Sequence, residues 1–165
     1  MTIVPRLLFL LLLILAAALI YTTSSWLPVR VATHFGTGGV ANGWMTRDGY
    51  VVFILALTTL LPLFIVAMTG FLPRVAASQI RIRDRDHWLS PTRRAETLAW
   101  LASHACWLGI VIVLFLLGIH LLTVEANMQV PARLSEPHIF VLLGAFGVGL
   151  VLWIAGLAMR FRRAL

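Results

Sequence analysis

The chain has 165 residues, of which 61% are hydrophobic and only 12% are charged, and its formal net charge is +7. A soluble domain of this length could not bury so much apolar surface in one core, so the composition predicts an integral membrane protein. All 13 cationic side chains are Arg, and most adjoin apolar segments, where they act as topology signals rather than as a nucleic-acid footprint. The single cysteine, Cys106, excludes an intrachain disulfide.

Four segments are apolar over close to the roughly 20 residues that an α-helix needs to cross a bilayer. Because lipid cannot satisfy open backbone groups, each segment is expected to be helical. The sequence therefore predicts a single all-α membrane domain over residues 1–165, with four transmembrane helices in a four-helix bundle. The approximate spans are residues 7–24, 50–72, 98–124 and 139–159.

The first apolar segment has a competing interpretation as a secretory signal. Arg6, the apolar run and the Ala16-Ala17-Ala18 cluster are typical of a signal with a small-residue cleavage site. The apolar run continues to Tyr21, past any such site, and this favours a retained first helix.

The distribution of Arg predicts the orientation of the spans. Ten of the 13 Arg lie before the first span, between the second and third, or after the fourth, whereas only Arg30, Arg47 and Arg133 lie in the other two connections. Positive residues near span ends favour the cytoplasmic side. Both termini are therefore expected in the cytoplasm, with the first and third connections facing outward.

The first connection has the composition of an ordered loop. Gly36, Gly38 and Gly39 permit positive backbone φ angles, and residues 31–35 alternate as a short strand does. The dipeptide Asn42-Gly43 favours a type I′ turn, so we expect a small hairpin in this connection. Asp48 is expected to cap the helix that follows.

Residues 27–44, "LPVRVATHFGTGGVANGW", resemble the signature of a bacterial integral-membrane family described as a domain of unknown function. That domain also forms the N-terminal part of Sdp-type toxin-immunity and signalling proteins. Asn42 stands where Asp is more usual, and Gly36 where Asn is common. The inner segment "DRDHWLSPTRRAETLAW" resembles members of the same family. The signature positions in this chain are Pro28, His34, Phe35, Gly39, Asn42, Gly43 and Trp44.

The resemblance implies a multi-span protein of the bacterial cytoplasmic (inner) membrane with an accessory or protective role, and it implies no reaction. We therefore expect a non-enzymatic, immunity-like protein that recognises a membrane-protein or peptide partner at the outer face, with no cofactor and no catalytic residue. No phosphate-binding loop, CxxC pair, nucleophile elbow or HExxH motif is present in the sequence. His104, in the third span, is expected to be a neutral side chain packed between helices, because no Asp or Glu lies in any span.

Two other functions remain open. His34, His120 and His138 could meet at the outer surface, with Glu125 or Glu136 adding oxygen ligands, and would then form a zinc or copper site of a small metal-binding protein or enzyme.

The third function is that of a subunit in a larger complex. Ala145, Gly149 and Gly156 in the fourth span permit close helix approach, either inside the bundle or against a partner or a second copy in a homo-oligomer.

Overall fold

The computed structural model describes residues 3–75, 80 and 82–162, and it is mostly helical. Four of its helices are long and apolar enough to cross a membrane, which confirms the predicted fold class. They are α1 (Ile3–Thr23), α2 (Arg47–Val75), α4 (Arg94–Asn127) and α5 (Glu136–Arg160).

Helices α2, α4 and α5 extend beyond the predicted spans at both ends, because a helix can continue into water at its ends. Helix α1 begins earlier than predicted but ends at Thr23, one residue before the predicted end. At the start of α2, the Thr46 hydroxyl accepts the N–H of Gly49 over 3.2 Å. Thr46 is therefore the capping residue, and the expectation that Asp48 would cap this helix was wrong. Asp48 lies instead in the first turn of α2, where its negative charge interacts favourably with the positive end of the helix dipole.

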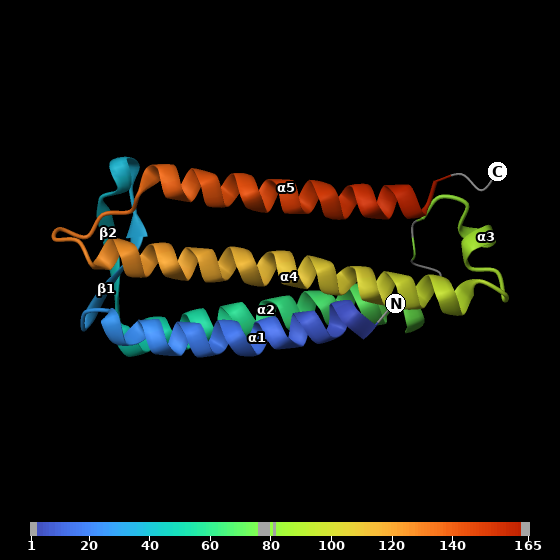
Figure 1. Cartoon of the computed structure of the whole chain (residues 1–165), viewed down its shortest axis with the longest axis horizontal. Helices are drawn as coiled ribbons and strands as arrows, with labels where there is room; N and C mark the ends of the chain where they lie inside the picture. Colours follow the sequence, from blue (N-terminus) through green and yellow to red (C-terminus); the bar gives the residue numbers. More distant parts are fainter. Residues whose placement is uncertain (1–2, 76–79, 81, 163–165) are drawn as a thin grey trace.

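The helices lie in three layers, with α4 in the middle (Figure 1). The helices α1, α2 and α4 pack against one another, whereas α5 packs on α4. No residue of α5 is buried. The structure is therefore a three-helix bundle with α5 added on the far side of α4, rather than a symmetric four-helix bundle.

Two buried apolar clusters hold the three-helix bundle together. One contains Ile20, Val31 and Ile54 and lies near the hairpin. The other contains Phe9, Cys106 and other residues of α1 and α4. Neither cluster draws on α5, in agreement with the exposed position of that helix.

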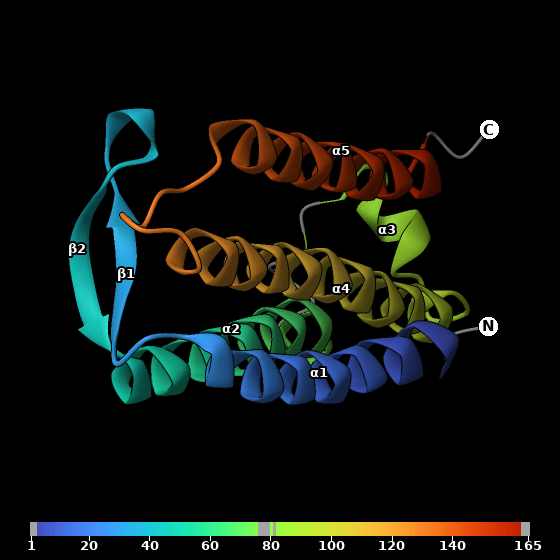
Figure 2. The ribbon, with the colours of Figure 1, turned by 60° about the vertical axis from the view of Figure 1, so that its left-hand side comes forward.

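The connection between α1 and α2 forms the expected hairpin, which lies across one end of the helices (Figure 2). It consists of β1 (Arg30–Phe35) and β2 (Ala41–Thr46), paired antiparallel. At the opposite end lie both termini of the described chain and the short helix α3 (Arg85–Trp88). We call these two ends the hairpin end and the Arg-rich end, the latter after Arg6, Arg93, Arg94, Arg160 and Arg162.

The turn of the hairpin does not lie where the sequence placed it. Asn42 and Gly43 belong to β2, and the chain reverses over residues 36–40 through a 3-10 turn. Gly38 and Gly39 have φ angles of 73° and 72°, which glycine adopts without strain. Two consecutive glycines thus supply the positive φ angles that the Asn-Gly pair was expected to supply.

Candidate functional site

His34, Asn42 and Gly43 form the framework of the hairpin. The His34 Nδ1 and the side-chain oxygen of Asn42 are hydrogen-bonded across the strands. An amide oxygen only accepts, so this bond places the proton on Nδ1. Gly43 is the register partner of His34, and a Cβ at Gly43 would come within 2.9 Å of the His34 Cβ. Position 43 therefore requires glycine.

The other signature residues lie around this framework. Pro28 is exposed directly after Leu27, whose side chain is buried in the cluster beneath the hairpin. Phe35 is half-buried at the end of β1. The indole of Trp44 is 46% exposed, and the Arg30 guanidinium carbon lies 5.2 Å from its ring centroid. This distance is that of a cation–π contact, which orients both side chains.

The tip of the hairpin is docked on the connection between α4 and α5. The Leu134 N–H donates to the Gly39 carbonyl over 2.9 Å, and the Arg133 Nε donates to the Gly38 carbonyl over 2.9 Å. The Gly38 N–H donates to Glu136 Oε1 over 2.8 Å. Gly39 is buried, and a Cβ there would overlap the Leu134 carbonyl oxygen. Only glycine therefore allows this docked arrangement.

The inner edge of the sheet is covered by one side chain, that of Asn127 at the end of α4. Its amide oxygen accepts the Ala32 N–H over 2.8 Å, and its amide nitrogen donates to the Ala32 carbonyl over 2.9 Å. Ala32 is the register partner of Trp44, and its backbone groups point away from β2. In an antiparallel ladder both members of such a pair point outward, so the N–H and carbonyl of Trp44 face the other edge of the sheet.

Along that other edge, β2 has no strand beside it in the part of the chain that the structure describes, and only the residue directly before it, Val40, forms a single antiparallel bridge, to Arg133. Figure 2 shows β2 on the side of the hairpin away from α4 and α5. Unpaired strand edges are templates for the addition of another strand. We call this the free edge of β2, and it includes the backbone groups of Trp44.

Beneath the hairpin, His120 joins α1, α2 and α4 through hydrogen bonds. The Thr23 hydroxyl donates to the Leu19 carbonyl over 2.6 Å, so its oxygen accepts from the His120 Nε2 over 2.8 Å. The His120 Nδ1 then accepts from the Tyr50 hydroxyl over 3.0 Å. This pattern requires a neutral imidazole, and it places the proton on Nε2. His120 is fully buried, so these bonds satisfy its polar atoms where water does not reach.

The predicted meeting of His34, His120 and His138 is not found. His120 is buried among the helices, His34 lies on β1 facing β2, and the His138 Nδ1 lies 3.1 Å from Glu125 Oε1. Within residues 3–75, 80 and 82–162, no three His, Cys, Asp or Glu side chains form a group that could hold a metal ion. Each imidazole is instead oriented by a neighbour in its own region.

A polar cavity of about 340 Å³ lies under the tip of the hairpin, between the end of α4 and the start of α5. Glu125 and Glu136 contribute carboxylates to it, and Arg133 contributes a guanidinium. Glu136 and Arg133 both bond to Gly38, so the cavity wall is part of the docking contact. Glu136 and Arg133 are therefore held in place by the hairpin and set its position over α5, whereas Glu125 pairs with His138.

Exposed apolar side chains gather at the hairpin end. Val130 is 99% exposed, and Val29, Trp26 and Met128 are each more than 60% exposed. Solvent-facing apolar side chains in this number mark surfaces that contact a membrane or another protein.

The Arg-rich end is held by aromatic stacking instead. The His104 ring lies between Trp100 and Trp153, at centroid distances of 4.5 Å and 4.9 Å. The His104 Nε2 donates to the Trp153 carbonyl, and the Trp153 indole donates to the His104 carbonyl, each over 2.9 Å. His104 thus joins α4 to α5, in agreement with the expectation that this side chain packs between helices. A Cβ at Gly156 would come within 3.0 Å of this ring, so a glycine makes room for it.

The small residues of α5 divide into two groups. A Cβ at Gly149 would come within 3.0 Å of Val111 on α4, and Ala145 lines the same contact. A Cβ added at Gly144 or Gly147 would meet no atom within 4 Å. Gly149 and Ala145 therefore pack against α4 within the chain, whereas Gly144 and Gly147 have open space beside them.

Residues 8–60 match the model of a family described as a domain of unknown function, DUF1648. The match covers most of α1, the hairpin and the first part of α2. Neither the curated proteins nor the solved structures give a match to this chain. The chain is therefore a multi-pass membrane protein with four candidate spans that carries this domain at residues 8–60.

Three features of the hairpin end were missed by sequence reasoning. Asn127 and Leu134 contact residues about 95 positions earlier in the chain, and no local pattern predicts such contacts. The bonds of His120 to Thr23 and Tyr50 likewise join three separate helices. The available signal was the polarity of Asn127, at the end of a long helix whose middle is apolar.

Proposed function

We propose that this protein is a non-enzymatic accessory protein of the bacterial cytoplasmic membrane, of the immunity-like kind, whose hairpin end binds an extended peptide segment of a partner protein. The observation that carries the proposal is the free edge of β2. The peptide would add a third strand to the sheet there, with its backbone paired to that of Trp44.

The docking of the hairpin supports this mode of binding. An extended peptide gains affinity from main-chain hydrogen bonds, and it loses less entropy when the receiving strand is already ordered. Asn127 holds β1 from one side, and the contacts of Gly38 and Gly39 hold the tip. The free edge is therefore presented in one fixed position.

The chemistry around the edge favours a peptide with apolar side chains. Trp44 is half-exposed on β2, and Val40 directly before β2 is 59% exposed. Alternate residues of an added strand would contact these side chains, as they do in other strand-addition complexes. The neighbouring polar groups are used to hold backbone: Glu136 binds Gly38 and Asn127 binds Ala32. This use of the polar groups supports binding rather than catalysis.

A photo-cross-linking experiment in cells tests the proposal. A photoreactive amino acid replaces Val40 in the full-length protein, and irradiation is expected to give one discrete protein adduct. In this background, Trp44→Ala removes the indole but keeps the outward N–H, whereas Trp44→Pro removes both. Proline is tolerated on an edge strand where its nitrogen faces away from the ladder. The adduct is expected to persist in Trp44→Ala and to disappear in Trp44→Pro.

A probe at Ile14 serves as the control, because this residue is 68% exposed in the middle of α1, outside the hairpin end. An adduct of the same size from Ile14 would mean non-specific capture and would contradict the proposal. Equal loss of the Val40 adduct in Trp44→Ala and Trp44→Pro would contradict backbone pairing at the edge.

A second candidate function, as a subunit of a larger membrane complex, is favoured by α5. This helix has no buried residue, and Gly144 and Gly147 leave its surface open to a neighbouring helix. If a second copy or another protein packs there, Gly147→Leu should dissociate it while leaving the chain folded. An unchanged assembly size in Gly147→Leu would remove this candidate.

A further inference from the structure

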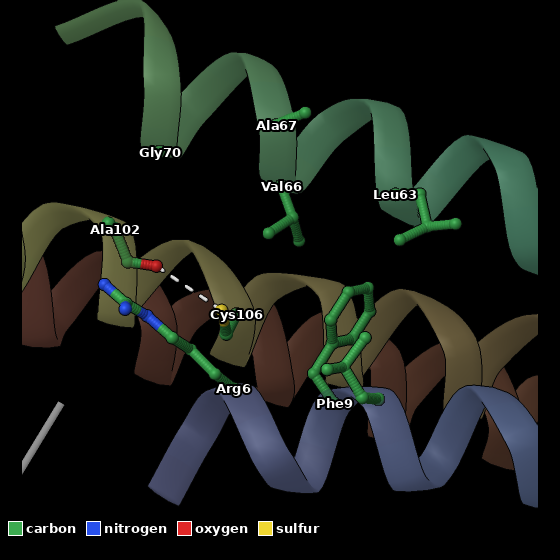
Figure 3. A pocket seen from close by; sticks show the side chains of 9 residues that line it. Arg6, Phe9, Leu63, Val66, Ala67, Gly70, Ala102 and Cys106 are labelled. Atoms are coloured by element: carbon green, nitrogen blue, oxygen red, sulfur yellow. Dashed lines mark hydrogen bonds between the residues drawn. The ribbon is translucent and has the colours of Figure 1, made fainter. Parts of the chain in front are cut away.

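A groove of about 350 Å³ lies at the Arg-rich end between α1 and α2, with α4 as its floor (Figure 3). Phe9 of α1, Leu63, Val66 and Ala67 of α2, and Cys106 of α4 form its apolar walls. Its volume is at the lower end of the range for small-molecule sites. The proposed function uses none of these residues, because they lie at the other end of the molecule from the hairpin.

Among the residues that the structure describes, Arg6 supplies the only charge in the lining of this groove. Figure 3 shows its side chain beside Ala102 and Cys106. In the described part of the chain, Arg6 forms no ion pair with a carboxylate, since the ion pairs there are His138 with Glu125 and Arg160 with Glu96. The Cys106 thiol donates to the Ala102 carbonyl over 3.4 Å, so it is already partnered. Among the described residues, the Arg6 guanidinium is therefore a charged group of the groove lining that has no carboxylate partner.

We propose that this groove binds one acyl chain of an anionic phospholipid from the surrounding bilayer, with the lipid phosphate at the Arg6 guanidinium. Arg6 lies in the first turn of α1, where the apolar run of the first candidate span begins, and a headgroup phosphate is expected at such a boundary when its chain runs along the helices. A guanidinium matches the geometry of phosphate oxygens and pairs with them through two N–H donors. Basic pockets between transmembrane helices bind anionic headgroups in this way.

The shape of the groove favours a lipid chain over a protein helix. A Cβ at Gly70 would lie 3.4 Å from the Ala102 Cα, so α2 and α4 are in contact beside the groove. A helix with its side chains is about 10 Å wide and needs a longer, wider trough than this contact leaves. Leu10, Leu63 and Ala67 are exposed, so the groove opens laterally toward the surrounding bilayer. A single flexible acyl chain can enter from the bilayer.

Native mass spectrometry of the full-length protein in mild detergent tests this proposal. Phosphatidylglycerol and phosphatidylcholine with identical acyl chains are added at equal concentration. We expect phosphatidylglycerol adducts to exceed phosphatidylcholine adducts about fivefold, the gain typical of one Arg near an anionic headgroup. Arg6→Gln should reduce the ratio to near one, and Arg6→Lys should keep most of it. Ala67→Trp should fill the groove from its exposed side and reduce the adducts of both lipids.

Two control variants match these changes at positions outside the groove. Arg162→Gln removes a charge at the same end, and Ala158→Trp adds an indole at an exposed position of α5. Both should leave the lipid ratio and the adduct level unchanged. The proposal is overturned if Arg6→Gln and Arg162→Gln lower the ratio equally, or if Ala67→Trp binds lipid as the wild type does. Inorganic phosphate alone should not compete, and competition by it would show an anion site without a chain.

Discussion

The hairpin end and the Arg-rich end are held by different kinds of interaction. At the hairpin end, backbone groups of Ala32, Gly38 and Gly39 are each paired with a specific partner on α4, α5 or their connection. At the Arg-rich end, the rings of His104 and Trp153 stack, and Arg160 lies 4.8 Å from the Trp88 ring centroid. Directional hydrogen bonds dominate at one end, and ring contacts dominate at the other.

The difference follows from the backbone. A hairpin and its loops leave N–H and carbonyl groups that a helix would satisfy internally, and these groups must find partners when they are covered. At the Arg-rich end α4 and α5 satisfy most of their own backbone groups, so ring packing joins them, with two hydrogen bonds between His104 and Trp153. The comparison therefore predicts that substitutions which break a backbone contact at the hairpin end cost more stability than conservative ring replacements at the Arg-rich end.

The largest effect is expected at Gly39. Gly39→Val forces a β-branched residue to a φ of 72° and places carbon atoms on the Leu134 carbonyl oxygen. The cost of the strained backbone and the lost hydrogen bond should together reach about 3 kcal/mol or more. Thermal unfolding and amide exchange of the hairpin in detergent would measure it. Gly144→Val, at a position with nothing within 4 Å, is the control and should change little. Equal melting of the two variants would contradict the docking.

The next effect is expected at Asn127. Asn127→Leu leaves the N–H and carbonyl of Ala32 without their partner, which should cost about 2 kcal/mol. Asn127→Asp keeps an acceptor for the N–H and should cost less, so the two variants separate the two bonds. Amide exchange at Ala32 is the most direct measurement. Gln129→Leu, at an exposed position close by, should leave that exchange rate unchanged.

A smaller effect is expected at His120. His120→Leu removes the hydrogen bonds to Thr23 and Tyr50 inside the bundle. Interhelical hydrogen bonds in membranes contribute about 0.6 kcal/mol on average and up to about 1.7 kcal/mol. A double-mutant cycle of His120→Leu with Tyr50→Phe, read by unfolding in detergent, should give a coupling energy in this range. A coupling energy of zero would mean that the two side chains do not interact.

The smallest effect is expected at His104. His104→Phe keeps a flat ring between Trp100 and Trp153 and removes only the hydrogen bond to the Trp153 carbonyl. Its cost should be about 0.6 kcal/mol. His104→Ala, which also removes the stack, should cost clearly more in the same unfolding assay. If His104→Phe were as damaging as Gly39→Val, the contrast between the two ends would fail.

The sequence predicted the parts of the fold that depend on local patterns. The four spans followed from the length of the apolar runs, and the hairpin followed from the alternation and glycines of residues 31–43. The turn was misplaced because Asn42-Gly43 and Gly38-Gly39 are both acceptable turn residues, and the choice between them depends on Leu134, far away in sequence. The outward position of α5 was missed for a related reason. An apolar helix in a bilayer has no amphipathic face to show which side is packed.

The candidate site was predicted in composition but not in geometry. The seven signature residues lie in or beside the hairpin, as the resemblance implied. The free edge of β2, however, depends on Asn127 covering the opposite edge, a contact that spans 95 residues. The three imidazoles proposed as a metal site were grouped by their expected depth in the membrane. Depth alone did not show that His120 is buried while His34 and His138 are exposed.

The central claim is that the hairpin is docked on the connection between α4 and α5 and therefore presents a fixed edge. Val40 and Arg133 form an isolated antiparallel bridge across this contact, and the native Cys106 is buried. In a Cys106→Ala background, Val40→Cys with Arg133→Cys should form a disulfide rapidly and nearly completely in membranes, since bridged residues lie within disulfide reach. Val29→Cys with Arg133→Cys should not. Absent cross-linking in the first pair, or equal cross-linking in both pairs, would show that the hairpin is not held there.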